Sequence, residues 1–179
     1  MKSQKGLTLI ELLISITLLG LLLGVFTSVY TNGVKVYQRE FKQANLQNEN
    51  RIVLDRIISD IKQAYSVDQT STATSLILLL PAIDEDGDIL YEGDDQFKTD
   101  QFIYLKSGQS LVKIIAPDID STREAVDKTI LDKVSSLTFT YLPDLETAEQ
   151  IEVTLQTQDT AGKNTITINN TSKATLRNK

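Results

Sequence analysis

The amino-acid sequence predicts an α+β fold, in which one long N-terminal helix packs on an antiparallel β-sheet body. Residues 7–34 contain a single charged side chain, Glu11, and apolar residues then recur at spacings of three and four up to about residue 65 without a proline. After residue 66 the apolar residues alternate in short runs that turn residues separate. A helical period followed by strand periods in separate parts of the chain is typical of this class.

The composition of the chain narrows its possible functions. The 179 residues include no Cys and no His, so the chain cannot supply a thiolate nucleophile, a Ser-His-Asp triad, a zinc finger or a disulfide. With 18 Lys and Arg against 24 Asp and Glu, the formal net charge is −6. Because nucleic-acid binding needs clustered positive charge, we expect no nucleic-acid partner. We also expect no enzymatic activity.

The N-terminal apolar run is long enough to cross a membrane. Residues 12–34 form an uncharged run of 23 residues, and a spanning helix needs about 20. The basic residues Lys2 and Lys5 precede this run. By the positive-inside tendency, the short leader stays in the cytoplasm and the C-terminal body is exported.

A secretory signal peptide and a plain signal anchor are two common N-terminal segments that also contain an apolar run. A secretory signal peptide would have a shorter apolar core and a small-residue cleavage site after it, and neither is present. A plain signal anchor fits the length. However, Glu11 would cost such an anchor roughly 2.5–3.5 kcal/mol near the bilayer centre and less near the interface. A free α-amine beside Glu11 would neutralise this charge, so the carboxylate becomes useful if the chain is cut just before it.

The second part of the helix is expected over residues 35–66. Its apolar stripe is interrupted by polar residues at Asn45, Gln47, Asn48 and Asn50. We therefore expect the helix to leave the membrane, cross a polar stretch and pack on the body with its 54–65 face. The apolar stripe consists of Val34, Tyr37, Phe41, Leu54, Ile57, Ile58, Ile61 and Tyr65. The whole helix would be about 55 residues long, far above globular norms.

The strands of the body are expected at six places within residues 67–179. They are residues 75–81, 100–106, 111–115, 137–141, 151–155 and 165–168. A Ser-Gly-Gln turn at 107–109 predicts a hairpin, and Gly162 predicts a turn over residues 159–163. We expect one antiparallel sheet or two small ones.

An acidic segment, residues 84–100, interrupts this pattern with eight acidic residues and one basic residue. Oxygen ligands at alternating positions suit Ca²⁺. The match to an EF-hand loop is poor, because Gly87 occupies its fourth position and Ile89 stands where the turn glycine belongs. A solvated acidic turn is therefore the alternative to a calcium site. The candidate calcium ligands are Asp84, Asp86, Asp88, Glu92 and Asp94.

The string KG-LTLIELLISITLLGLLLG at residues 5–24 resembles the class III signal of type IV prepilins and pseudopilins. The resemblance implies that a prepilin peptidase cuts after Gly6 and methylates the new amine on Leu7. The family's glutamate, fifth after the cut, then falls on Glu11. Leu7 stands where the family usually has Phe, and Ser28 stands where many major pilins have a helix-kinking proline.

The same resemblance implies the partners of the chain. They are the prepilin peptidase, other pilins or minor pilins in a filament, an inner-membrane assembly platform and membrane lipid. Gly20 and Gly24 form a G-x-x-x-G pair, which allows another helix to approach closely in lipid. The implied location is the inner membrane with the body outside, followed by the pilus or cell surface.

Three body segments look like J-type minor pseudopilins and related minor pilins, namely residues 50–64, 130–141 and 174–178. This likeness favours a minor pilin that joins a type IV pilus or initiates its assembly. A minor pseudopilin of a type II secretion or competence machine is the alternative. An alternative of another class is a membrane-anchored, calcium-dependent binding module. The expected organisation is a leader at 1–6, an assembly helix at 7–34, its amphipathic continuation at 35–66 and a β-rich body at 67–179.

Overall fold

The computed structural model describes residues 8–93, 96–162 and 164–177. By its internal contacts the chain divides into two compact units, residues 1–42 and residues 43–179. One helix, α1 (Leu9–Gln63), continues for 55 residues from the first unit into the second. Its length agrees with the helix that the sequence predicts, and it is uninterrupted at Ser28, where no proline breaks the backbone hydrogen bonds.

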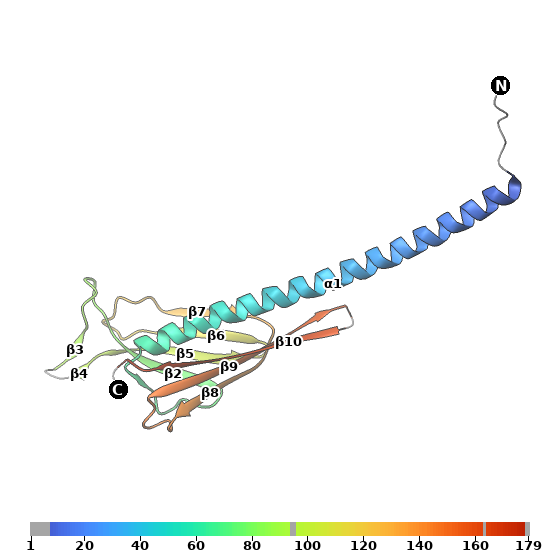
Figure 1. The fold of residues 1–179 in the computed structure, drawn as a ribbon. Coiled ribbons are helices and arrows are strands. Elements are labelled where there is room, and N and C mark those ends of the chain that lie inside the picture. Colours follow the sequence, from blue (N-terminus) through green and yellow to red (C-terminus); the bar gives the residue numbers. More distant parts are fainter. Residues whose placement is uncertain (1–7, 94–95, 163, 178–179) are drawn as a thin grey trace. The chain divides into compact units, whose positions relative to one another are not determined.

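The body after α1 consists of antiparallel strands (Figure 1). The strands are β1 (Ser66–Val67), β2 (Ser75–Pro81), β3 (Tyr91–Glu92), β4 (Gln96–Phe97), β5 (Thr99–Ser107), β6 (Ser110–Ala116), β7 (Val126–Leu131), β8 (Val134–Leu142), β9 (Gln150–Ala161) and β10 (Asn164–Thr175). They form a five-stranded sheet in the order β1-β2-β5-β6-β7, a three-stranded sheet in the order β10-β9-β8 and the small pair β3-β4. The α+β prediction is therefore confirmed, with two main sheets.

Most predicted strands are present, but one predicted turn is misplaced, and β1, β3, β4 and β7 are absent from the predicted set. The turn predicted over residues 159–163 begins too early, because β9 continues to Ala161 and pairs Thr160 with Thr165. Strand β7 is absent from the predicted set, because its sequence VDKTIL mixes charged and apolar residues without clean alternation. The predicted hairpin between β5 and β6 is confirmed, and Gly108 there has φ +61°, a conformation that glycine adopts readily.

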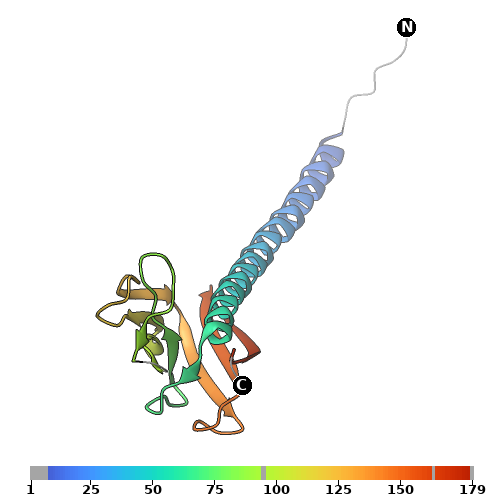
Figure 2. The same ribbon diagram turned by 90° about the vertical axis from the view of Figure 1, so that its left-hand side faces the viewer.

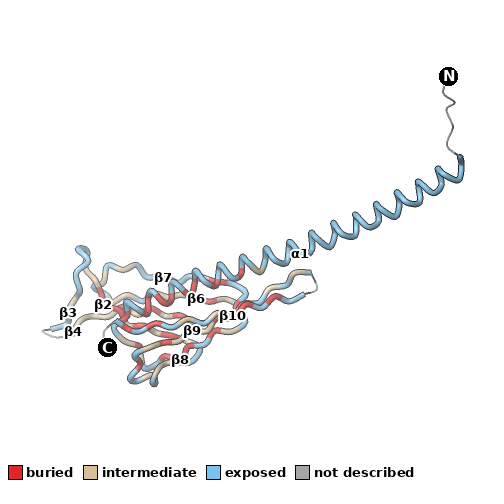
Figure 3. Tube along the Cα trace, viewed as in Figure 1, coloured by how far each residue is buried: buried red, intermediate tan, exposed pale blue. Residues whose placement is uncertain are grey.

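The core of the second unit lies between the C-terminal part of α1 and the inner faces of the two main sheets (Figures 2 and 3). Ile57 and Ile61 on α1 are fully buried, as the predicted stripe requires. In the polar stretch before them, Asn45, Gln47 and Asn48 are exposed, as the prediction requires, whereas the neighbouring Leu46 and Asn50 are buried. Leu46 packs on Ile166 and Ile168 of β10, and Asn50 is fully buried. The Asn50 Nδ2 donates a hydrogen bond to Thr157 Oγ1 at 2.9 Å, whereas its Oδ1 has no hydrogen-bond partner among the described residues.

A second buried polar contact joins α1 to the five-stranded sheet. The carboxylate of Asp60 accepts hydrogen bonds from the Tyr104 hydroxyl on β5 and the Lys113 ammonium on β6. Burial raises the pKa of the Tyr104 hydroxyl far above its usual value, and the Asp60 charge adds to this effect. The Lys113 ammonium also lies 4.5 Å from the centre of the Phe102 ring. These contacts set the position of α1 along the sheet.

Candidate functional site

The predicted processing residues Gly6 and Leu7 lie outside the described residues, which begin at Thr8. Thr8 precedes α1, and its carbonyl accepts hydrogen bonds from the backbone N–H groups of Glu11 and Leu12 at 3.0 and 3.1 Å. The Thr8 N–H lies 3.4 Å from the Glu11 carboxylate oxygen Oε2. A Thr followed three residues later by Glu is the capping-box spacing, in which the glutamate turns back to the start of its helix. The motif LTLIE contains this spacing, which is a further local signal for the position of Glu11.

The first unit exposes a continuous apolar surface. Every described Leu, Ile, Val and Phe side chain from Leu9 to Val29 is more than half exposed. Length and composition make α1 the one helix in the described chain that could cross a membrane. Its hydroxyl side chains are bonded within the helix: Ser15 donates to the Glu11 carbonyl and Thr27 to the Leu23 carbonyl, both at 2.8 Å. Such internal bonds satisfy polar groups that would otherwise face lipid unpaired.

Gly20 and Gly24 both lie in the exposed part of α1. A Cβ added at either position would meet no atom of the described chain within 4 Å. The two glycines are therefore not needed for packing within this chain. Their proposed role in close approach by another helix stays a prediction.

The acidic segment forms a turn around the side chain of Asp84. Its Oδ1 accepts hydrogen bonds from the backbone N–H groups of Asp86 and Asp88, each at 2.9 Å. Gly87, with φ +84°, completes the turn. The described residues contain no group of three or more acidic side chains placed to hold a metal ion, and Asp94 lies outside them. Calcium binding stays a prediction. Titration of the chain with Ca²⁺ tests it, since binding would release heat and raise the unfolding temperature.

Two charges of the acidic segment have partners elsewhere. Asp100 is fully buried and forms an ion pair with Arg123. Its carboxylate also accepts hydrogen bonds from the Asp118 N–H at 2.8 Å and from the Ser121 hydroxyl at 2.9 Å. Lys98 pairs with Asp120 and lies 3.5 Å from the Asp118 carboxylate. The hydrogen bond to Asp120 raises the pKa of the Lys98 ammonium above its usual value. These contacts attach the loop after β6 to the acidic segment.

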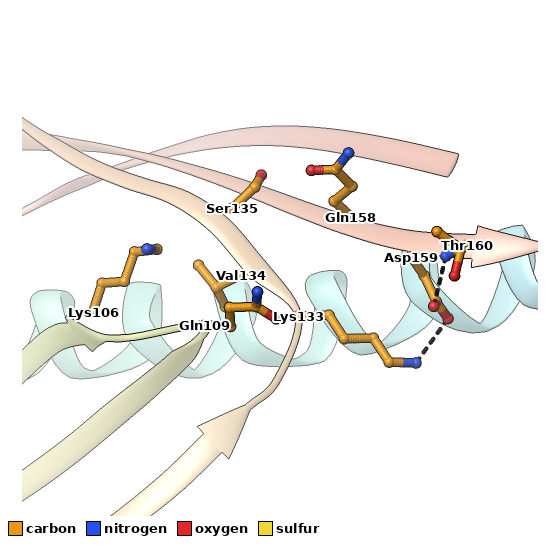
Figure 4. A pocket seen from close by; sticks show the side chains of 8 residues that line it. All are labelled: Lys106, Gln109, Lys133, Val134, Ser135, Gln158, Asp159 and Thr160. Carbon is orange, nitrogen blue, oxygen red and sulfur yellow. Dashed lines mark hydrogen bonds and ion pairs between the residues drawn. The ribbon is translucent and has the colours of Figure 1, made fainter. Parts of the chain in front are cut away.

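The body also has an open groove of about 490 Å³ at the end where β5 and β6 meet β8 and β9 (Figure 4). Its lining residues are Lys106, Gln109, Lys133, Val134, Ser135, Gln158, Asp159 and Thr160. Lys133 pairs with Asp159 at 2.7 Å, and the Lys106 ammonium donates to the Gly108 carbonyl at 2.7 Å. The Asp159 hydrogen bond raises the pKa of Lys133. The ammonium groups of Lys106 and Lys133 are therefore both bonded within the chain, as is typical of structural contacts.

Comparison with known proteins gives one match. Residues 1–27 match the family model described as the prokaryotic N-terminal methylation motif. No curated protein and no solved structure matches the chain. The motif points to a structural pilin-like subunit, a kind of protein that is usually not an enzyme, and fits a membrane-anchored chain with a C-terminal body. The methylation motif, together with the long apolar helix that begins within it at Leu9, fits the class III signal of type IV pilins and pseudopilins.

Proposed function

We propose that this chain is a structural subunit that is cleaved after Gly6, methylated at Leu7 and incorporated into a type IV pilus as a minor pilin. The observation that carries the proposal is the methylation motif at residues 1–27, which includes the start of an apolar helix that the described chain leaves uncovered. A subunit of this kind stays in the inner membrane until it enters a filament. The body is then outside the cell, and the chain has no enzymatic role.

The charge on Glu11 explains how cleavage prepares the helix for assembly. After cleavage, the new α-amine of Leu7 is four residues from Glu11, about one helical turn away. The Thr8 N–H already lies 3.4 Å from Glu11 Oε2, so the carboxylate is directed toward that end of the helix. The attraction between an amine and a carboxylate that pair in a low dielectric offsets part of the cost of burying each charge. Pairing within the subunit or with a neighbour would let the helix pack among apolar helices.

The proposed partners follow from this sequence of steps. The prepilin peptidase would act on residues 6–7, and the assembly platform and other pilins would contact the helix after cleavage. The three J-like segments favour a minor subunit that acts near the start of the filament. The same segments support the second candidate, a minor pseudopilin of a type II secretion or competence machine. Deletion of the gene distinguishes the two candidates. Loss of pili would support the minor pilin, whereas loss of secretion or of DNA uptake would support the minor pseudopilin.

Glu11→Ala tests the structural role. We expect the variant to be cleaved and methylated as the wild type is, because residues 6–7 are unchanged. Its incorporation into sheared filaments should fall at least tenfold, since the Leu7 amine would have no carboxylate partner. Intact mass and immunoblots of the sheared fraction measure both effects. Ser15→Ala is the matched control on the same helix, and equal incorporation of the two variants would contradict the proposal.

A further inference from the structure

Residues 30–42 of α1, at the end of the apolar run, carry two stripes of side chains on different faces of the helix. Tyr30 and Tyr37 are seven residues apart and share one face, and their side chains are 72% and 70% exposed. Lys35 and Arg39 are four residues apart and share another face. With 3.6 residues per turn, Lys35 and Tyr37 point about 160° apart. The segment is therefore aromatic on one side and basic on the other.

Both stripes are open to a partner outside the first unit. Lys35 and Arg39 are exposed, and neither makes an ion pair or a side-chain hydrogen bond to a residue that the structure describes. The rings of Tyr37 and Phe41 stack with their centroids 6.3 Å apart, but this contact leaves Tyr37 70% exposed. Figure 3 shows this part of α1 as exposed along its whole length.

The aromatic stripe begins where the hydrocarbon core of a membrane would end. Tyr30 follows Glu11 by 19 residues, a rise of about 28 Å along the helix, and no charged side chain lies between them. The hydrocarbon core of a bilayer is about 30 Å thick. With Glu11 at one boundary of this core, Tyr30 lies at the other, where tyrosine is enriched in membrane proteins. Lys35 is about 7 Å further along the helix, within the headgroup layer.

The basic side chains lean back toward the apolar run. In an α-helix every Cα–Cβ bond tilts toward the N-terminus, and the N-terminal part of α1 is its apolar part. Long basic side chains near the end of a spanning helix reach back to the membrane surface while their backbone lies outside it. Arg39 is one turn beyond Lys35, so its guanidinium can reach the same headgroup layer.

Charge indicates what the basic stripe contacts. Residues 30–42 contain three basic residues and one acidic residue, Glu40. Lipid phosphates are the acceptors next to a stripe that continues a membrane span, and each basic residue near an anionic membrane surface gains about fivefold in affinity. Basic residues directly after a span on the exported side are disfavoured by the positive-inside tendency. A contact with anionic headgroups would compensate for that effect.

We propose that Lys35 and Arg39 bind the phosphate groups of anionic lipids on the exported face of the membrane. This contact holds Tyr30 and Glu11 at the two boundaries of the hydrocarbon core, so residues 6–7 are kept at the cytoplasmic surface, where the peptidase would cut. The proposal rests on the proposed function, which makes α1 a membrane anchor before assembly and gives its orientation. The contact uses residues of the first unit only, so it is the same wherever the body lies.

Fluorescence of a single tryptophan tests the lipid contact, because the chain has no tryptophan of its own. The full-length chain with Tyr30→Trp is reconstituted in vesicles of phosphatidylcholine and phosphatidylglycerol in equal amounts, with bromine on the acyl chains of one lipid or of the other. Bromine quenches only a nearby tryptophan, so the two quenching levels measure which lipid surrounds the helix. We expect phosphatidylglycerol to be enriched about threefold or more, and added NaCl to weaken the enrichment.

Charge variants of the Tyr30→Trp chain identify the residues that hold the lipid. Lys35→Gln with Arg39→Gln should make the two lipids quench equally, because both positive charges are removed. Lys35→Arg with Arg39→Lys keeps the charges and should keep the enrichment. Arg51→Gln with Lys62→Gln is the matched control, because it changes the net charge of the same helix equally at positions at least 12 residues beyond Arg39. This control should also keep the enrichment.

The position of the bromine tests the depth of α1. With bromine near the headgroup end of the acyl chains, quenching should be stronger than with bromine near the methyl end, because position 30 lies at the core boundary. The Lys35→Gln with Arg39→Gln variant should show a smaller difference between the two bromine positions. Stronger quenching from the methyl end in the parent chain would overturn the proposed depth.

The outcomes separate this inference from the proposed function. Equal quenching by the two lipids in the Tyr30→Trp chain, or an enrichment that survives Lys35→Gln with Arg39→Gln, shows that the lipid contact is wrong. The proposed function still stands in that case if the wild-type chain is cleaved and enters filaments. If the enrichment depends on Lys35 and Arg39 but the chain in cells keeps residues 1–6, the proposed function fails and the lipid contact stands.

Discussion

The Asp60 carboxylate lies on the buried face of α1 and bonds to two strands of the sheet body, through Tyr104 on β5 and Lys113 on β6. The side chains of Asp60 and Lys113 are 12% and 13% exposed. A buried ion pair adds little net stability compared with apolar residues of the same size, but removal of one partner leaves a buried charge without compensation. The contact therefore matters most when it is broken.

We expect Asp60→Ala to lower the free energy of unfolding by about 3–5 kcal/mol, because the Lys113 ammonium would lose its carboxylate in a largely buried position. Urea unfolding of the full chain in detergent micelles measures the change. The control is Arg51→Ala, which removes an exposed ion pair to Asp55 at 3.8 Å with side chains 79% and 74% exposed. That change should cost less than about 1 kcal/mol. Similar losses in both variants would contradict the structural role of Asp60.

Ionisation of Tyr141 is expected to lower the stability of the body at alkaline pH. Burial raises the pKa of Tyr141 to about 12, against the opposing effect of the nearby Ser71 hydroxyl. In the unfolded chain a tyrosine ionises near pH 10. Between about pH 10 and 12 the unfolded chain therefore loses this proton first, and stability falls as the pH rises.

We expect Tyr141→Phe to show a shallower fall of unfolding temperature over that range than the wild type. At neutral pH the variant should be slightly less stable, since the Tyr141 hydroxyl donates to the Thr72 carbonyl at 2.9 Å. Thermal unfolding at several pH values from 9 to 12 measures both effects. Tyr91→Phe, at an exposed position, should follow the wild-type curve. Parallel curves for all three chains would show that Tyr141 does not contribute.

Among the elements, α1 is one continuous helix with an exposed apolar part and a part that packs on the sheet body. From Leu9 to Val29 its apolar side chains are exposed, and from Leu46 to Ile61 one face is buried in the body. The exposed half has no partner in the described part of the chain, so its stability in water is low and lipid or neighbouring helices must cover it. Substitutions there should act on assembly and leave the fold of the body unchanged.

The double substitution Gly20→Leu and Gly24→Leu tests whether changes in the exposed part of α1 affect assembly without changing the fold of the body. No atom of the described chain lies within 4 Å of a Cβ at either position, so the unfolding transition of the body should not change. If another helix approaches at these glycines, the leucines would keep it away and filament incorporation should fall severalfold. The Gly20→Ala and Gly24→Ala pair should incorporate better than the leucine pair. Full incorporation of the leucine variant would rule out close packing at this face.

For the whole molecule, charge is distributed very unevenly. Residues 84–100 carry eight acidic residues and one basic residue, whereas residues 1–34 carry only Lys2, Lys5 and Glu11. Cleavage after Gly6 would remove both lysines and change the formal net charge from −6 to −8. The mature chain would then be acidic at its exported end and nearly uncharged in its membrane segment.

We expect two forms of the chain that differ in mass and charge. In cells without the prepilin peptidase, the chain should keep residues 1–6 and focus at a higher isoelectric point. In wild-type cells it should be shorter, carry two fewer positive side chains and have a methylated Leu7. Intact-mass spectrometry and isoelectric focusing of the purified chain detect the difference. A chain in wild-type cells that still begins with Met1 would contradict the processing step.

Local patterns in the sequence were sufficient for the α+β class, the 55-residue helix, most strand positions and the N-terminal signal. Each depends on residues close together in the chain, such as the spacing from Gly6 to Glu11 or the alternation at Leu137, Phe139 and Tyr141. The burial of Asn50 and the existence of β7 were not found this way. A polar residue on a helix looks exposed unless its distant partner is known, and an edge strand does not need clean alternation.

Contacts between distant residues required the folded structure. Asn50 meets Thr157 across 107 residues, and Asp60 meets Lys113 across 53. The order of the strands is another such property, because any antiparallel set with the same alternation could have been arranged differently. That order makes β1, β7, β8 and β10 the outer strands of the two main sheets. Long-range pairing depends on the packing energy of the whole core, whereas helical period and membrane length depend on side chains within a few turns of one another.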